Sequence, residues 1–149
     1  MTAQACPSKN DLCPVCGIPP DSEHFDVSSF APLPAAGREV VLARFELTHQ
    51  YCGLLELFSQ FTDEFFGNAA AAETPAIDWR LQVNGRPLSP YGSMRAILNP
   101  WGFGSFGIRV RLPEAARLEL VARGVPVSAP SPITRIGGRL AGKYWFNRA

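Results

Sequence analysis

The chain has 149 residues, a length that fits one ordinary domain with a single core. Hydrophobic residues make up 46% of it and charged residues 18%, so the composition is globular but poor in surface charge. The net charge of +1 argues against a general affinity for polyanions, and we expect no nucleic-acid partner. The sequence has no apolar run of about eighteen residues and no signal peptide at its N-terminus, so we expect synthesis in the cytoplasm and no membrane partner.

Residues 1–37 are expected to form an extended N-terminal arm. Prolines at positions 7, 14, 19, 20, 32 and 34 repeatedly exclude a helix interior or a central strand there. From residue 38 the sequence becomes apolar and alternating. We therefore predict two parts, an arm over 1–37 and a folded domain over 38–149.

The folded domain is expected to begin with a strand in "REVVLARFELT", with Val40, Leu42 and Phe45 directed inward. The next apolar segment, "GLLELFSQFTDEFF", fits a helical stripe, but its aromatic and Thr content suits a strand. Periodicity does not decide between the two.

A β-hairpin is predicted in "IDWRLQVNGRPL". Trp79, Leu81 and Val83 alternate with polar residues, as in a half-buried strand. Asn84-Gly85 is the dipeptide favoured in a two-residue hairpin turn, because both residues tolerate a positive φ.

The Gly- and Pro-rich connection over 89–106 carries three large aromatic residues, Tyr91, Trp101 and Phe103. Such residues usually pack as a lid over a sheet, and the alternative is a platform for a ligand. We take these three residues as candidate interaction residues.

Two alternating runs follow in "GIRVRLPEAARLELVAR", and we expect them to form an antiparallel pair around "PEAA". The chain ends on "ITRIGGRLAGKYWF", in which Leu140, Gly142, Tyr144 and Phe146 share one face of a strand predicted to lie inside a sheet. Together the segments predict an all-β protein. The expected architecture is an antiparallel two-sheet sandwich of jelly-roll or Greek-key type with an extended N-terminal arm.

The order of these segments resembles small β-sandwich structural proteins of tailed-phage and prophage virions. The likeness rests on "QYCGLLELFSQFTD", "DWRLQVNGRPL", an "NPWG" loop, "IRVRLPEAARLELVARG" and "RIGGRLAGKYWFN", and it spans about residues 50–147. It implies a non-enzymatic virion protein, either a capsid decoration or cement subunit or an accessory of the neck or tail. The implied partners are the major capsid protein or other virion proteins. A homo-oligomer such as a trimer is a common solution for proteins on such lattices.

Chemistry is most strongly indicated by Cys13-Pro-Val-Cys16-Gly, because two thiolates spaced in this way form half of a structural zinc site. Cys6 and His24 are the nearest candidates for the other two ligands, with Cys52 or His49 as replacements if the arm folds onto the sandwich. Free thiols and a disulfide are the other two readings of the cysteines. Metal content and a thiol count would separate the three.

No catalytic arrangement emerges from the sequence, and we expect no enzyme. His49 and Cys52 lie three residues apart and would point to opposite faces of a strand. "GFGSFG" lacks the Lys-Ser/Thr of a phosphate-binding loop. The functional alternative to a virion protein is a carbohydrate- or protein-binding β-sandwich module with a zinc-stabilised arm.

Overall fold

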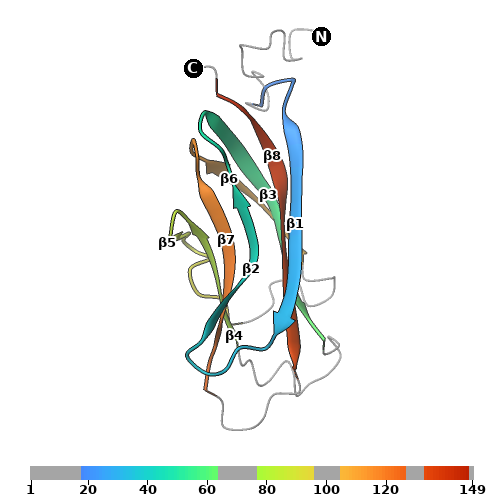
Figure 1. The fold of residues 1–149 in the computed structure, drawn as a ribbon, viewed down its shortest axis with the longest axis vertical. Coiled ribbons are helices and arrows are strands. Elements are labelled where there is room, and N and C mark those ends of the chain that lie inside the picture. The colour runs from blue at the N-terminus through green and yellow to red at the C-terminus, as the bar shows by residue number, and fades with distance from the viewer. Residues whose placement is uncertain (1–17, 64–76, 96–104, 127–132, 148–149) are drawn as a thin grey trace.

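The computed structural model describes residues 18–63, 77–95, 105–126 and 133–147. The regular elements in these ranges are strands, and they form two four-stranded antiparallel sheets (Figure 1). The strands are β1 (Glu23–Pro32), β2 (Glu39–Glu46), β3 (Tyr51–Thr62), β4 (Ile77–Val83), β5 (Arg86–Pro87), β6 (Ser105–Leu112), β7 (Arg117–Gly124) and β8 (Arg135–Phe146). The predicted all-β, two-sheet antiparallel sandwich is confirmed. Among the described residues, no helix has the length and apolar character needed to cross a membrane.

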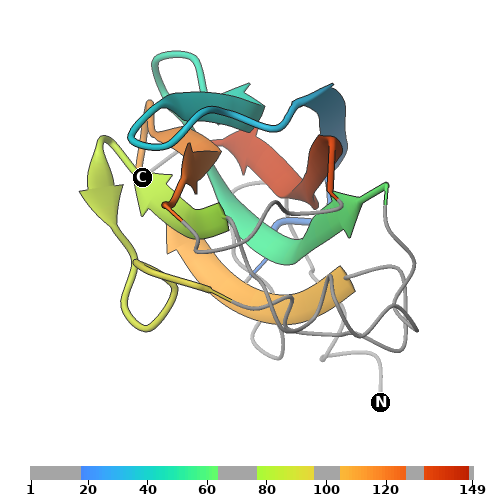
Figure 2. The same ribbon diagram turned by 90° about the horizontal axis from the view of Figure 1, so that it is seen from below.

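The first sheet has the strand order β1-β8-β3-β6 and the second has β2-β7-β4-β5. Figure 2, a view along the strands, shows the two sheets as layers. Four of the pairings are nested in sequence: β1 pairs with β8, β2 with β7, β3 with β6 and β4 with β5. The chain is therefore a long antiparallel ribbon that has been folded over into two layers.

The core lies between the two layers, and every second side chain of a strand points into it. In β7, Leu118, Leu120 and Ala122 are fully buried, because alternate residues of this strand face the first sheet. Phe58 of β3 and Leu140 of β8 meet them from the other layer and are equally buried. Burial of this kind stabilises a fold by roughly 25 cal/mol for each Å² of apolar surface removed from water.

The predicted hairpin is confirmed. Asn84 and Gly85 both have a positive φ, 53° and 78°, as a primed two-residue turn requires. The Asn84 side chain also accepts a hydrogen bond from the backbone N–H of Arg117, at 2.9 Å, and so ties the turn to β7. Trp79 and Leu81 are buried on the inner face, as expected.

Strand β2 begins within the predicted segment, and a β-bulge changes its side-chain alternation. The pairing with β7 shifts between Val41 and Ala43, so Leu42 and Ala43 are both buried. Val40 and Phe45 are partly buried and pack against the core. The inward directions predicted for Val40, Leu42 and Phe45 are confirmed, and the bulge explains their uneven spacing.

The predicted boundary at residue 38 needs correction, because β1 lies inside the range expected to be an arm. All ten residues of β1 pair with β8 in the first sheet. The prolines that indicated an arm lie before this strand, at its last residue or just after it, and the run from residue 23 to 31 has none. As an edge strand, β1 also tolerates its terminal Pro32.

The expected antiparallel pair around "PEAA" is also wrong, because β6 and β7 belong to different sheets. A turn carries the chain from one layer to the other, with the Ala116 N–H donating to the Pro113 carbonyl and a positive φ at Ala115. Alternation identifies the inner face of a strand but not its neighbour. The ambiguous segment proves to be strand β3, and β8 lies inside its sheet as predicted.

Candidate functional site

The cysteine-rich part of the predicted metal site, with Cys6, Cys13 and Cys16, lies outside the described residues. His24 is described, and its backbone pairs with Lys143 in β1 and β8. Its side chain belongs to the outer face of the first sheet, because its neighbour Phe25 is buried in the core. Within the described ranges, no three His, Cys, Asp or Glu side chains form a metal-binding group. The zinc site stays a prediction.

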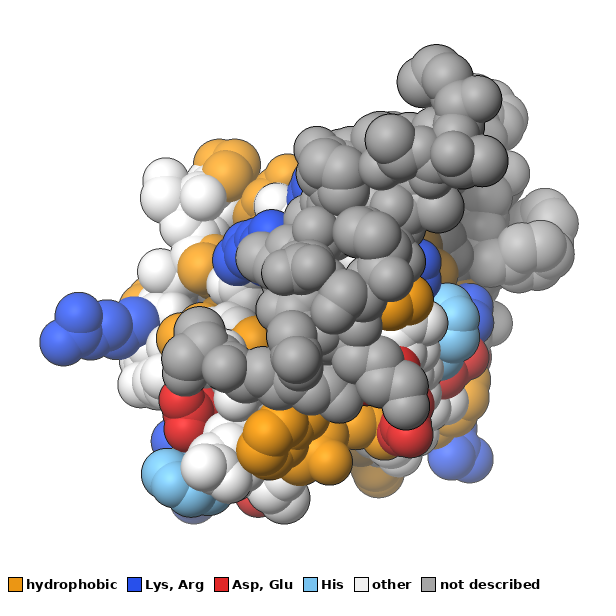
Figure 3. Space-filling model, turned by 90° about the horizontal axis from the view of Figure 1, so that it is seen from above, with side chains coloured by type: hydrophobic (Ala, Val, Ile, Leu, Met, Phe, Trp, Pro, Cys, Tyr) orange, Lys and Arg blue, Asp and Glu red, His pale blue; other side chains and the backbone are white. Residues whose placement is uncertain are grey.

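Cys52, the alternative ligand, lies beside a small second cluster on the outer face of the first sheet. Ile18 packs there against Leu54 and Trp145, with Cys52 partly buried next to them. Burial raises the pKa of the Cys52 thiol, which keeps it protonated near neutral pH. His49 is separate, with a side chain 86% exposed and its Nδ1 3.6 Å from Glu114. The two histidine side chains, pale blue in Figure 3, lie apart at this end of the molecule.

Of the three candidate aromatic residues, Tyr91 is described, whereas Trp101 and Phe103 lie outside the described residues. The Tyr91 ring packs edge to face against Phe58 and Phe106, with centroid distances of 5.6 and 5.8 Å. Its carbonyl accepts a hydrogen bond from the Leu81 N–H at 2.9 Å. Tyr91 therefore covers the core, as a lid residue does.

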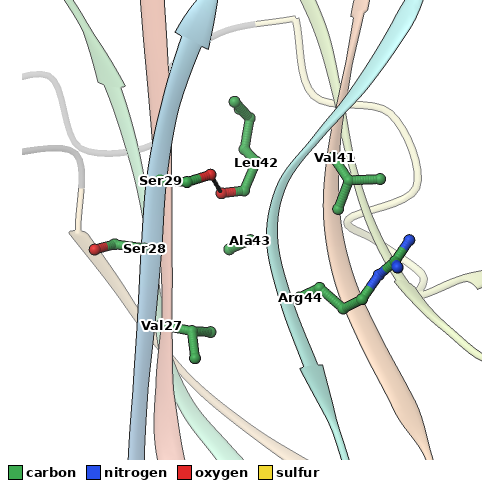
Figure 4. A pocket seen from close by; sticks show the side chains of 7 residues that line it. All are labelled: Val27, Ser28, Ser29, Val41, Leu42, Ala43 and Arg44. Carbon is green, nitrogen blue, oxygen red and sulfur yellow. Dashed lines mark hydrogen bonds between the residues drawn. The ribbon is translucent and has the colours of Figure 1, made fainter.

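A groove of about 400 Å³ runs between β1 and β2, where the free edges of the two sheets face each other (Figure 4). The Ser29 hydroxyl donates to the Leu42 carbonyl at the bulge and bridges the two edges. Phe25 and Phe45 stack with centroids 3.9 Å apart and join the same two strands. Side chains thus close this side of the sandwich. The groove is lined by Val27, Ser28, Ser29, Val41, Leu42, Ala43 and Arg44.

Glu119 forms a polar network on the outer face of the second sheet. Its side chain is only 4% exposed, and it accepts hydrogen bonds from Arg44 at 2.7 Å and from Gln82 at 3.0 Å. Arg117 lies 3.3 Å away. Burial by itself would raise the pKa of this carboxyl group, but the hydrogen bonds from Gln82 and Arg44 and the charges of Arg44 and Arg117 outweigh it, and the pKa is lowered from its ordinary value of 4.5.

We expect the Glu119 network to make stability depend on pH. A carboxyl group with a lowered pKa in the folded state stabilises the fold above its unfolded pKa, and this contribution is lost as the pH falls through the folded pKa. The free energy of unfolding, measured in urea, should therefore fall between about pH 5 and pH 3. Glu119→Gln should cost about 1–3 kcal/mol at pH 7 and flatten that pH dependence.

The matched control for this prediction is Glu39→Gln, which alters an exposed ion pair with Arg80 at 3.1 Å. It should change the stability at pH 7 by less than about 1 kcal/mol. Equal effects of the two variants, or an unchanged pH dependence in Glu119→Gln, would contradict the role given to Glu119.

A pair of surface aromatic residues was not foreseen from the sequence. Phe30 of β1 and Phe61 of β3 lie on the outer face of the first sheet, with ring centroids 6.0 Å apart. Both residues pair in register with Gly137 of β8, which lies between them. The sequence does carry one sign of it, because Phe30 falls on the outer face of an alternating strand. That sign goes unused because the segment is assigned to the arm.

No protein-family model matches the chain, and no curated protein matches it in sequence. The class that the described residues define is an antiparallel two-sheet β-sandwich of eight strands. Its two outer faces differ, since one carries the Glu119 network and the other carries the aromatic pair and the Ile18 cluster.

Proposed function

We propose that this chain is a non-enzymatic structural protein of a tailed-phage virion. It would act as a capsid decoration or cement subunit, or as an accessory of the neck or tail, that docks on a lattice of major capsid or other virion proteins and stabilises it. The observation that carries the proposal is the nested pairing of β1 with β8, β2 with β7, β3 with β6 and β4 with β5. We infer from it that the sandwich is a jelly roll, an architecture that recurs in viral capsid proteins.

The edges of the second sheet do not favour docking through added strands. Unprotected edge strands invite pairing with other chains, and bulges or very short strands prevent it. In the second sheet, one edge strand is β2 with its bulge, and the other is the two-residue β5. A homo-oligomer, for which a trimer is a common symmetry on such lattices, would accordingly not form by strand addition to this sheet.

Fold alone does not determine function, so the particle has to be tested directly. Tailed particles released from cells that carry the gene are purified and probed with an antibody against the chain, by immunoblot and by immunogold electron microscopy. We expect the protein in the particles, with gold at regular positions on the head, neck or tail. Particles from a strain lacking the gene are the control.

Heating the same two kinds of particle tests whether the protein stabilises them. Particles without the protein should release their DNA at a lower temperature than particles that contain it. Absence of the protein from purified particles would refute the proposal. The Tyr91 ring gives the binding-module alternative no support, because it is packed against Phe58 and Phe106.

A further inference from the structure

Phe30 and Phe61 lie on the surface and are not part of the core. Phe30 is 62% exposed, the largest value among the exposed large hydrophobic residues described. Neither ring belongs to the residues that pack in the main core or in the Ile18 cluster. Phe61 beside it is half-buried, so the two rings form one contiguous apolar patch on the outer face of the sheet. Contiguous exposed apolar surface is a feature of interaction and ligand-binding sites.

Gly137 lets the Phe30 ring lie close to the sheet. A Cβ atom at this position would come within 2.5 and 2.6 Å of ring atoms of Phe30, so the ring occupies the space that a side chain would fill. Phe30, Gly137 and Phe61 form one row across three strands. The rings, inclined to each other by 32°, therefore form a shallow aromatic platform on the sheet surface.

Polar groups continue this platform along β1. Asp26 and Ser28 lie on the same face as Phe30 because side chains of a strand alternate with period two. The Asp26 carboxylate accepts two hydrogen bonds from Arg139, at 2.8 and 2.7 Å. Both side chains of this ion pair are partly exposed, and Ser28 pairs in register with Arg139. From Asp26 to Phe30 the row extends about 13 Å, at about 3.3 Å per residue.

We propose that this face is a carbohydrate-binding site, in which Phe30 and Phe61 stack on the apolar face of a sugar ring. Asp26, Ser28 and Arg139 bind hydroxyl groups of the same or the next ring. Ligand sites commonly combine aromatic and apolar side chains with a few fixed polar groups that orient the ligand. The length of the row fits a short oligosaccharide. The site is independent of the proposed virion role and uses residues different from Tyr91, Trp101 and Phe103.

Other ligands fit these residues less well. A stable protein interface buries about 800 Å² on each partner, far more than two rings provide. A cationic ligand would meet Arg135 and Arg139, which lie on either side of Gly137 on the same face. A single-stranded nucleic acid could also stack on the rings, but the net charge of the chain, +1, gives it no general attraction for polyanions.

The test uses the full-length chain on an array of microbial polysaccharides and of cello-, xylo- and chito-oligosaccharides. A bound oligosaccharide is then titrated by calorimetry against the protein and its variants. We expect binding to at least one glycan, with Phe30→Ala about tenfold weaker or worse and Phe30→Trp close to the original. Phe30→Ala should fold normally, because the ring is exposed, and its circular dichroism and melting temperature check this.

The matched control is Phe146→Ala, which removes a 38% exposed aromatic ring elsewhere in the same sheet and should leave glycan binding unchanged. Two results would overturn the site: no glycan bound under conditions where a reference lectin binds, or glycan binding that survives Phe30→Ala. A third would reassign it, namely Phe30-dependent binding of a fifteen-residue oligothymidylate without any glycan binding. None of these results bears on whether the protein is present in virions.

Discussion

Deleting residues 1–32 is expected to abolish cooperative folding of the chain. The deletion removes β1, so β8 loses a neighbour along ten paired residues. It also removes Phe25, whose buried ring stacks on Phe45 between the layers. Loss of a buried Phe side chain alone costs about 3–5 kcal/mol, a large part of the stability of an ordinary domain. Circular dichroism and urea unfolding of the purified variant measure the effect.

A shorter deletion, of residues 1–17, is the control. It keeps Ile18 and all eight strands, and we expect it to unfold cooperatively with a native β-sheet spectrum. The sequence-based boundary at residue 38 implies instead that the longer deletion leaves a folded sandwich. A cooperatively unfolding 33–149 fragment would therefore contradict the place of β1 in the first sheet.

Substituting Gly142 by alanine is expected to destabilise the protein by about 3 kcal/mol or more. Gly142 lies in β8, and a Cβ atom there would be 2.0 Å from the backbone carbonyl oxygen of Leu54 and 2.9 Å from the Phe25 ring. Because the nearest atom belongs to the backbone, relief requires the pairing of β3 with β8 to shift. Urea unfolding should show a lower midpoint.

Gly107→Ala is the matched control for this substitution. Gly107 lies in β6 of the same sheet, and an added Cβ atom would meet no atom within 4 Å. We expect a neutral or slightly stabilising effect, since glycine inside a strand costs conformational entropy on folding. Similar losses of stability in both variants would show that the close approach at Gly142 does not limit the sheet.

Local signals predicted the elements of this fold, and non-local pairing limited the prediction. Asn84-Gly85 identified its hairpin because the turn chemistry lies in two adjacent residues. β6 and β7 were correctly placed on the chain, yet they were paired with each other because alternation carries no information about which strand lies alongside. β1 was missed because prolines on both sides of a proline-free run dominated the composition.

The aromatic platform could not be predicted from the sequence, because it also depends on which strands lie side by side. Phe30 and Phe61 are 31 positions apart in the sequence. Gly137, which lies between them, belongs to a third strand, β8. Tyr91 was found as an isolated aromatic residue on a loop, but its contacts with Phe58 and Phe106 follow from the packing of the sheets. The type of a residue indicates that its side chain needs a packing partner, but it does not say which residue that partner is.

The nested pairing of the strands has a consequence for the time at which the protein can fold. Tyr144 donates a hydrogen bond to Glu23, 121 positions earlier, and the two strands that hold them are neighbours in the first sheet. β8 lies between β1 and β3, so β1 has no partner strand in the first sheet, and β3 has only β6, until β8 has left the ribosome. Contacts of such sequence separation slow folding. We therefore expect the first sheet to stay incomplete, and the chain to depend on protection from aggregation, until β8 is made.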